Sequence, residues 1–179
     1  MIARLPSIPR LEYSATNQEG RRRLMPELTL AEIPSAVVHR LHDYWMAKGG
    51  ALGRIPSRSD IEPLELVEIL PNLAIVEAIE GRWRYRLIGT RIVEFVGRDS
   101  TGKFFDELEF ERREPFWVRR YTRVFAGEVL HGRDVMRWVE RDFIPYYWIG
   151  LPLLTPDGRI GQAIGALDFL VGEAASGGG

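Results

Sequence analysis

Two glycines and a lysine lie at the spacing of a phosphate-binding loop. Gly97, Gly102 and Lys103 match this pattern in "GRDSTGK". Such a loop also needs a hydroxyl side chain directly after the lysine to hold magnesium, and a helix whose N-terminus points at the phosphates. Phe104 occupies the hydroxyl position, and predicted helical turns precede the stretch in place of a buried strand. We therefore interpret both glycines as backbone breaks and do not predict nucleotide hydrolysis.

The three histidines are the candidates for a metal or haem site. His39 and His42 lie three residues apart on a predicted helix, so both could face one ion, whereas His131 is far away in the sequence. Packing or surface roles are favoured for all three. The chain contains no Cys, which excludes disulfides, thiolate ligands, Cys nucleophiles and flavin-cysteine photochemistry. It also has no Gly-x-Ser-x-Gly motif, and no pair of carboxylates stands out.

Two polar residues interrupt an apolar strand near the end of the chain. Gln162 and Asp168 belong to "IGQAIGALDFL", whose other residues on the same side are apolar. A polar side chain that faces a core needs a hydrogen-bond partner, which either the protein or a ligand can supply. A partner within the protein is favoured, and Asp168 is kept as a candidate ligand contact.

Length, composition and charge describe one ordinary globular domain. The chain has 179 residues, 45% hydrophobic and 27% charged, and a net charge of −1, which gives no field to attract nucleic acid. Pro6, Pro9 and Arg10 interrupt the N-terminus where a secretion signal needs an apolar run. Because no stretch is long and apolar enough to span a membrane, we expect a cytoplasmic protein that binds no membrane.

The chain divides into four predicted parts. Residues 1–28 are expected to form a flexible arm that carries three consecutive arginines, and residues 172–179 a flexible tail. Residues 29–71 are expected to hold a helix and a proline-rich connector. Residues 72–171 are expected to form the main folded core.

A helix is predicted between Ser35 and Lys48. Its start is open, because Thr29 with Glu32 forms a capping box and Pro34 suits a first turn. The apolar positions lie on one stripe, and a stripe of this kind must be buried against something. We therefore predict that residues 35–48 provide a surface for a protein partner or a second copy. The stripe consists of Val37, Val38, Leu41 and Trp45.

The remaining pattern predicts two strands, a helical middle and three further strands. The first two, 73–79 and 82–88, are joined by a tight turn at Gly81, and in the second Trp83, Tyr85 and Leu87 alternate with arginines. Helical turns are expected from Thr90, and a longer helix from Pro115 to Gly127. The last strands are predicted to pair in antiparallel fashion because short turns join them. They span 129–140, 143–154 and 159–170.

The order of elements and several motifs resemble those of PAS domains, in particular the stand-alone PAS_5 proteins of alphaproteobacteria. The resemblance covers about residues 35–170 and is carried by "YWMAKGG", "RIPSRSDIEPLEL", "ILPNLAIVE", "RYRLIGTRIVEFVGRDSTGKFFDEL" and "LPLLTPDG". It implies an α+β PAS fold: a five-stranded antiparallel sheet in the order 2-1-5-4-3, helices on one face, an extra N-terminal helix and a small apolar cavity.

The resemblance also implies a bacterial, non-catalytic sensory module that signals through a partner or a dimer. No cofactor is required, and an unknown small ligand, apolar or aromatic, is expected in the cavity. Two alternatives stay open. One is a small enzyme that uses the cavity, with Asp168, His131 or Arg91 as contributors, and the other is a haem or flavin sensor. The predicted ligand-binding residues are Tyr85, Ile92, Phe95, Trp117, Tyr121 and Asp168.

Overall fold

The computed structural model describes residues 28–108, 116–136 and 144–170. Five strands form one antiparallel sheet in the order β2-β1-β5-β4-β3, as predicted. The strands are β1 Leu73–Ile79, β2 Arg82–Ile88, β3 Leu130–Met136, β4 Ile144–Leu154 and β5 Ile160–Phe169. The α-helices are α1 Ala36–Ala47, α2 Thr90–Val96 and α4 Phe116–Phe125. Short 3-10 turns are η1 Leu30–Glu32, η2 Gly50–Leu52, η3 Arg58–Asp60, η4 Pro63–Leu66, η5 Leu70–Asn72 and η6 Phe105–Glu107.

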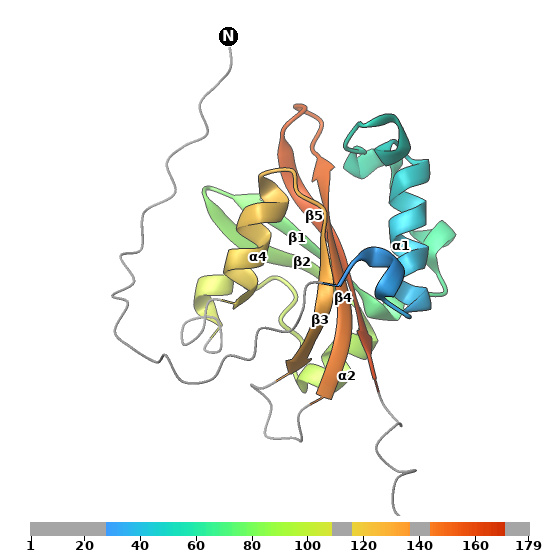
Figure 1. Cartoon of the computed structure of the whole chain (residues 1–179). Helices are drawn as coiled ribbons and strands as arrows, with labels where there is room; N and C mark the ends of the chain where they lie inside the picture. Colours follow the sequence, from blue (N-terminus) through green and yellow to red (C-terminus); the bar gives the residue numbers. More distant parts are fainter. Residues whose placement is uncertain (1–27, 109–115, 137–143, 171–179) are drawn as a thin grey trace, which may run out of the picture.

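Helices cover both faces of the sheet. Figure 1 shows α4 on one side and α1 on the other. Ile92 of α2 belongs to the same core as the buried residues of α4. Successive side chains of a strand point to opposite faces, so β5 places Ala163 in the core beneath α4 and Ile164 in the core beneath α1. Both residues are at most 1% exposed. The central strands are therefore buried on both sides, which is why β4 and β5 are nearly continuous apolar runs.

Of the two predicted helix-start signals, the capping box belongs to a separate turn, and Pro34 lies before the N-cap of α1 and not in its first turn. Thr29 and Glu32 form a capping box around η1. Ser35 is the N-cap of α1, and its side chain accepts a hydrogen bond from the Val38 backbone amide at 3.1 Å. The chain therefore makes a separate 3-10 turn before the helix proper.

The apolar stripe of α1 packs on the sheet of its own chain. Four side chains of the helix are at most 6% exposed and share a core with β4 and β5. The prediction of a partner surface at residues 35–48 depended on an uncovered stripe, and this premise is wrong. The buried helix residues are Val38, Leu41, Tyr44 and Trp45.

The connector after α1 is tied to β4 by backbone bonds. The Leu154 amide donates to the Pro56 carbonyl at 2.9 Å, and Ser57 forms a parallel bridge with Leu154. The charged residues Arg58 and Asp60 do not take part in this link, because the bonds described for them lie within the connector. Asp60 accepts from the Ser57 amide, and Arg58 donates to the carbonyl of Ile61.

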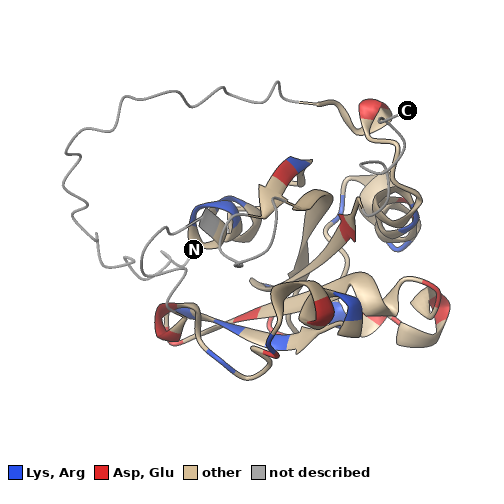
Figure 2. Cartoon of the chain, turned by 90° about the horizontal axis from the view of Figure 1, so that it is seen from below, with Lys and Arg blue, Asp and Glu red and all other residues tan. Residues whose placement is uncertain are grey.

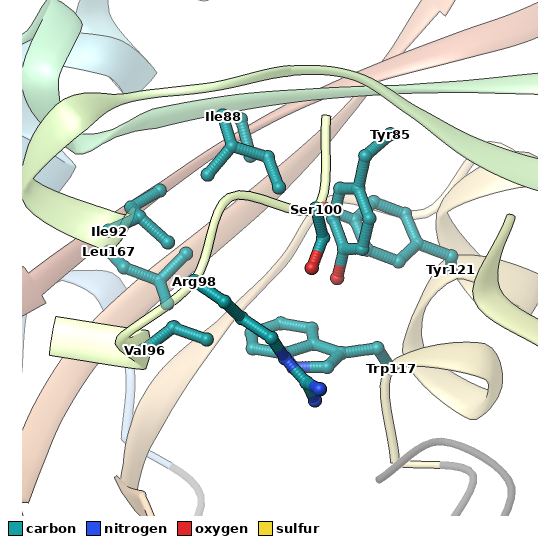
Figure 3. A pocket seen from close by; sticks show the side chains of 10 residues that line it. Tyr85, Ile88, Ile92, Val96, Arg98, Ser100, Trp117, Tyr121 and Leu167 are labelled. Atoms are coloured by element: carbon teal, nitrogen blue, oxygen red, sulfur yellow. The ribbon is translucent and has the colours of Figure 1, made fainter. Parts of the chain in front are cut away.

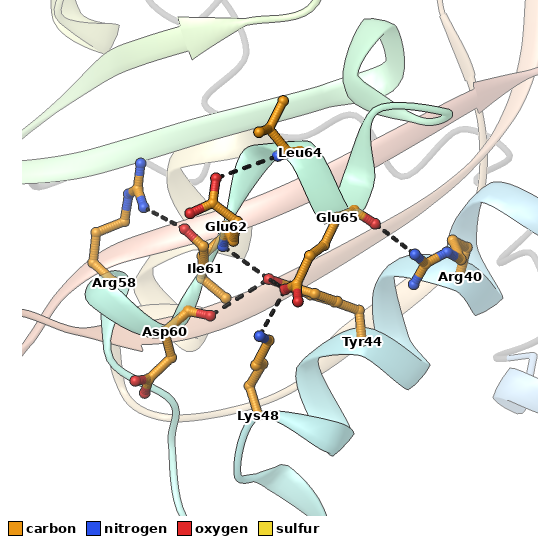
Figure 4. A network of polar contacts seen from close by, with 9 residues as sticks. All are labelled: Arg40, Tyr44, Lys48, Arg58, Asp60, Ile61, Glu62, Leu64 and Glu65. Atoms are coloured by element: carbon orange, nitrogen blue, oxygen red, sulfur yellow. Dashed lines mark hydrogen bonds and ion pairs between the residues drawn. The ribbon is translucent and has the colours of Figure 1, made fainter.

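Tyr44 joins α1 to the connector (Figure 4). Its hydroxyl donates to Glu65 at 2.6 Å and accepts from the Glu62 amide at 2.8 Å. Lys48 pairs with the same Glu65 carboxylate at 2.6 Å. The hydrogen bonds from Lys48 and Tyr44 hold the pKa of Glu65 below its ordinary value. This network fixes the connector against the helix.

The β1–β2 hairpin contains a bulge that changes which side chains face inward. Glu80 and Gly81, both at positive φ, form the predicted tight turn. Further along, Val76 pairs with Tyr85 and Ile75 with Leu87, so the register skips Arg86. Leu87 therefore lies on the opposite face from Tyr85 and is 38% exposed, which corrects its predicted place on the same apolar side.

Several predicted features fall outside the described residues. These are the arm at 1–28 apart from its last residue, Pro115 at the start of α4, the outer ends of the strands around 137–143, and the tail at 172–179.

Charged residues of both signs are interspersed over the described elements (Figure 2). Several arginines pair with acidic neighbours, such as Arg82 with Asp106 at 2.6 Å. The helices in the described part of the chain all fall short of the length and apolar character that crossing a membrane requires.

Candidate functional site

The segment between α2 and η6 lies on the α4 side of the sheet and forms no helix or strand. Gly97 ends α2 at φ +79°, in the left-handed region that favours glycine, and Gly102 forms a turn at φ +82°. Beyond Gly102 the chain lies along the edge of β2: the Gly102 amide donates to the Tyr85 carbonyl, and the Tyr85 amide donates to the Lys103 carbonyl. Residues 97–102 thus form a short loop held at both ends, and we call them the glycine loop.

A cavity of about 40 Å³ lies between this loop, α2, α4 and the sheet. Its walls come from β1, β2, β5, α2, α4 and the glycine loop, and they are mostly apolar or aromatic (Figure 3). The lining residues are Ala74, Tyr85, Ile88, Ile92, Val96, Arg98, Ser100, Trp117, Tyr121 and Leu167.

Aromatic rings hold the shape of the α4 side of this cavity. Phe105 lies between Tyr85 and Tyr121, with ring centroids 4.4 Å and 5.5 Å apart respectively. Trp117 lies 6.2 Å from Tyr121 and meets Trp148 edge to face. Contacts of this type stabilise by about 0.5–1.5 kcal/mol each beyond simple burial, so the wall is built to keep its geometry.

A partly buried ion pair lies next to Trp117. The guanidinium of Arg120 lies 3.8 Å from the ring centroid of Trp148 and 5.1 Å from that of Trp117, and it pairs with Asp134 at 2.8 Å. Burial lowers the pKa of Arg120 from its ordinary value. Because Arg120 is not part of the lining, its place is structural: it fixes the tryptophan that forms the wall.

Polar groups enter the cavity from the glycine loop. Ser100 is 4% exposed, and Figure 3 shows its hydroxyl directed into the space between the labelled side chains. Arg98 also lines the cavity, and it is exposed, so its charged end lies towards solvent. The site is thus an apolar hollow with a hydroxyl inside and a positive charge at its mouth. Such a site can bind a molecule, and the described residues that line it include no His, Asp or Glu.

Four of the six predicted ligand-binding residues meet at this cavity. Tyr85, Ile92, Trp117 and Tyr121 all line it. Phe95 lies in the same core but beside the cavity, where it stacks on Phe169 at 4.2 Å. That these residues bind a ligand remains a prediction.

The expectation that Asp168 lines the cavity is wrong. Along β5, Leu167 points to the cavity and Asp168 to the opposite face, where its carboxylate accepts a hydrogen bond from Ser35 at 2.7 Å. The partner is therefore internal, as the buried-polar argument favoured. Gln162 lies on that same face, and its Oε1 is buried without a hydrogen-bond partner among the described residues.

The histidines lie on the α1 side of the sheet, away from the cavity. His39 bonds to the Ile33 carbonyl at 2.7 Å, and His131 on β3 is paired with Ile149 of the α1-facing core. Within the described residues, no three His, Asp or Glu side chains are grouped so that they could hold a metal ion.

Haem and flavin do not fit the described cavity. Pockets for ligands of drug size have volumes of about 300–1,000 Å³. A cavity of about 40 Å³ has room for roughly three water molecules, at 10–15 Å³ for each. The rings of Tyr85, Trp117 and Tyr121 occupy the space that a large planar group would need.

Sequence reasoning missed six lining residues for identifiable reasons. Ile88 faces inward because of the bulge, which strand alternation does not foresee. Ala74 and Leu167 lie on strands that are apolar on both faces, so the pattern does not tell which face meets the cavity. Arg98 and Ser100 belong to the stretch considered as a phosphate loop, and Val96 to the predicted helical turns; nothing in their types marks them as cavity residues.

Comparisons with known proteins show which family the chain resembles. A profile of the PAS_5 family, described as a PAS domain, matches residues 34–167. No curated protein matches the chain. Among solved structures, the chain is similar to the LOV protein of Rhodobacter sphaeroides, with 9% identity, a TM-score of 0.44, and coverage of 64% of this chain and 71% of that one. It is also similar to a fungal LOV domain photoreceptor, with 16% identity, a TM-score of 0.44, and coverage of 69% and 99% respectively.

Proposed function

Because the chain belongs to the PAS domain family, we propose that it is a sensory module that binds a small apolar or aromatic molecule in the cavity beneath α2 and α4. The observation that carries the proposal is the cavity itself. Its walls are almost wholly apolar, and a rigid set of aromatic rings holds them open. Sites of this kind bind ligands by burying apolar surface, with a few polar groups to orient them.

Binding of a ring-sized molecule requires the cavity to widen. The glycine loop is the wall best suited to move, because its interior residues lack the ladder bonds that hold the strands and a glycine at positive φ lies at each end. A ligand that binds the widened state better than the closed state shifts the population towards it. Movement of the loop would reach the edge of β2 through the bonds between Gly102, Lys103 and Tyr85.

Ligand binding would then change how the chain contacts a partner protein or a second copy of itself. The apolar stripe of α1 is buried in the monomer, so it does not support residues 35–48 as the contact surface. The loop side of the β2 edge is the better candidate, since it adjoins the part of the fold that a ligand moves.

The three residues that the enzyme alternative requires in the cavity do not line it. Asp168 and His131 lie on the opposite face of the sheet from the cavity, and Arg91 packs over Phe95 and does not line it. Titratable groups that converge in a pocket are the physical mark of acid-base chemistry. These three do not converge here.

The proposal is tested by blocking the cavity. Ala74 lines it from β1, while Ala78 lies on the same strand and is exposed. We expect a neutral aromatic probe such as indole to raise the melting temperature of the wild-type protein and to shift the amide signals of residues 97–102. Ala74→Leu should abolish both effects, and Ala78→Leu should retain them.

Two results would count against the proposal. One is a panel of small apolar and aromatic metabolites that leaves melting temperature and amide spectra unchanged. The other is a well-folded Ala74→Leu protein that binds the probe as tightly as the wild type, because binding would then occur elsewhere.

A further inference from the structure

Ser100 carries a buried hydroxyl that faces the cavity. The residue is 4% exposed and lines the cavity, and Figure 3 shows its hydroxyl directed into the space between the labelled side chains. Among the residues that the structure describes, none forms a hydrogen bond with this hydroxyl. The large majority of buried polar side-chain atoms are hydrogen-bonded, because an unmet one is costly. A molecule in the cavity is therefore placed to supply the missing bond.

Local hydrogen bonds hold the turn that carries this hydroxyl. The Thr101 amide donates to the Asp99 carboxylate at 2.9 Å, and the Lys103 amide donates to the Ser100 carbonyl at 3.0 Å. A group that is ordered before binding loses little freedom when a ligand arrives, which favours affinity. A ligand would thus meet a hydroxyl that the surrounding turn already orients.

The described surroundings of Ser100 favour an uncharged partner. The other residues of the described lining are apolar or aromatic apart from Arg98, which is exposed and already takes part in another interaction. Tyr85 and Tyr121 also carry hydroxyls, and both already have contacts of their own. Burying a charge without a paired group costs far more than burying a neutral oxygen. A neutral oxygen needs only a donor, and a serine hydroxyl supplies one.

We propose that the ligand is a small uncharged molecule with an apolar or aromatic body and a hydroxyl or carbonyl oxygen, which accepts a hydrogen bond from Ser100. This assignment rests on the proposed function and narrows it to one class of molecule. A hydrocarbon of the same shape fills the same space but leaves the serine hydroxyl unmet. The two are therefore distinguished by one neutral hydrogen bond, which changes an affinity about fivefold.

The test measures by calorimetry at pH 7 how Ser100→Ala changes the affinity for matched probes. The pairs are phenol with toluene, and cyclopentanone with methylenecyclopentane, which covers two body sizes. We expect Ser100→Ala to weaken the oxygen-bearing member of at least one pair about fivefold and to leave its hydrocarbon within about twofold. Comparing two proteins with the same probe removes the difference in water solubility between the probes. Ser59→Ala is the control, since Ser59 is an exposed serine outside the lining, and it should change neither affinity.

The ligand-free protein gives a second readout. Because no described residue bonds to the Ser100 hydroxyl, its removal breaks no bond of the fold. The melting temperature of Ser100→Ala should therefore not fall below that of the wild type. A clear fall would show that the hydroxyl serves the fold, and it would overturn the role in binding.

Failure of this assignment differs from failure of the proposed function. If Ser100→Ala weakens both members of each pair equally, or weakens neither, the role of Ser100 is overturned and binding in the cavity stands. The same holds if Ser59→Ala reproduces the effect. If indole binds and neither oxygen-bearing probe does, the ligand class is overturned. If none of the probes binds, indole included, the proposed function itself fails.

Discussion

The imidazole of His131 lies at the boundary between β3 and α1, remote from the cavity. Its Nδ1 is buried and has no hydrogen-bond partner among the described residues. Burial, and to a lesser extent the charge of His42 on α1, lower the pKa of His131 from its ordinary value of 6.5. The neutral ring is therefore the form that the fold accommodates.

This shift predicts a pH dependence of stability. Because the folded protein binds this proton more weakly than the unfolded chain, acid favours unfolding. The stabilising contribution is complete above about pH 6.5, the unfolded pKa, and is lost as the pH falls from there through the folded pKa. We expect the urea midpoint to fall between pH 7.5 and 5.5, and to fall less in His131→Gln. Val129→Ala, a non-titrating change just before β3, should keep the wild-type dependence. Equal losses in wild type and His131→Gln would show that other groups are responsible.

Single residues were predictable where their partners lie nearby in the chain. The Thr29–Glu32 capping box was recognised because its two partners lie three residues apart. Asp168 was misplaced because its partner, Ser35, lies 133 residues away. Nothing in the local pattern of β5 shows which of its two apolar faces meets the cavity.

At the level of elements, the turn from β2 into α2 depends on a glycine for space and not for dihedral freedom. Gly89 has φ −66°, which any residue adopts, but a Cβ there would lie 2.3 Å from the Pro71 carbonyl oxygen and 2.5 Å from that of Leu70. Both atoms belong to the backbone of η5 and cannot move aside singly. The amide of Gly89 also donates to the Leu73 carbonyl at 2.7 Å.

We therefore expect Gly89→Ala to lower the free energy of unfolding by about 3 kcal/mol, at the upper end of the cost of overpacking. Gly97→Ala is the matched control. A Cβ at Gly97 would meet nothing within 4 Å, so the cost there is the positive φ alone, about 1 kcal/mol. Chemical denaturation of both variants measures the difference. A smaller loss for Gly89→Ala than for Gly97→Ala would contradict the packing argument.

The elements themselves were largely predictable. Tight turns, helix caps and strand composition are local signals, and they placed all five strands and three helices. The bulge at Arg86 and the 3-10 turns of the connector were not foreseen, because they arise from how distant segments pack. The bulge turns Ile88 towards the cavity, so the cavity was anticipated and its full lining was not.

For the molecule as a whole, α1 is a structural layer whose apolar stripe is buried against the sheet of its own chain. Leu41 is 0% exposed and lies in the core that α1 shares with β4 and β5. We expect Leu41→Ala to lower the free energy of unfolding by about 2–5 kcal/mol, the usual cost of such a cavity. The mass measured by light scattering should be unchanged from the wild type. Val37→Ala, at a half-buried position of the same helix, should cost less. A halved mass for Leu41→Ala would instead assign the stripe to a dimer.

Coverage of the sheet on both faces also bears on how the chain can vary over evolutionary time. In a two-layer domain, one side of each strand meets water and accepts neutral substitution. Most residues of β4 and β5 are buried on one face or the other, so the middle strands have little such freedom. Sequence drift among relatives should therefore concentrate in β2, β3 and the turns, and it should leave the centre of the sheet nearly unchanged.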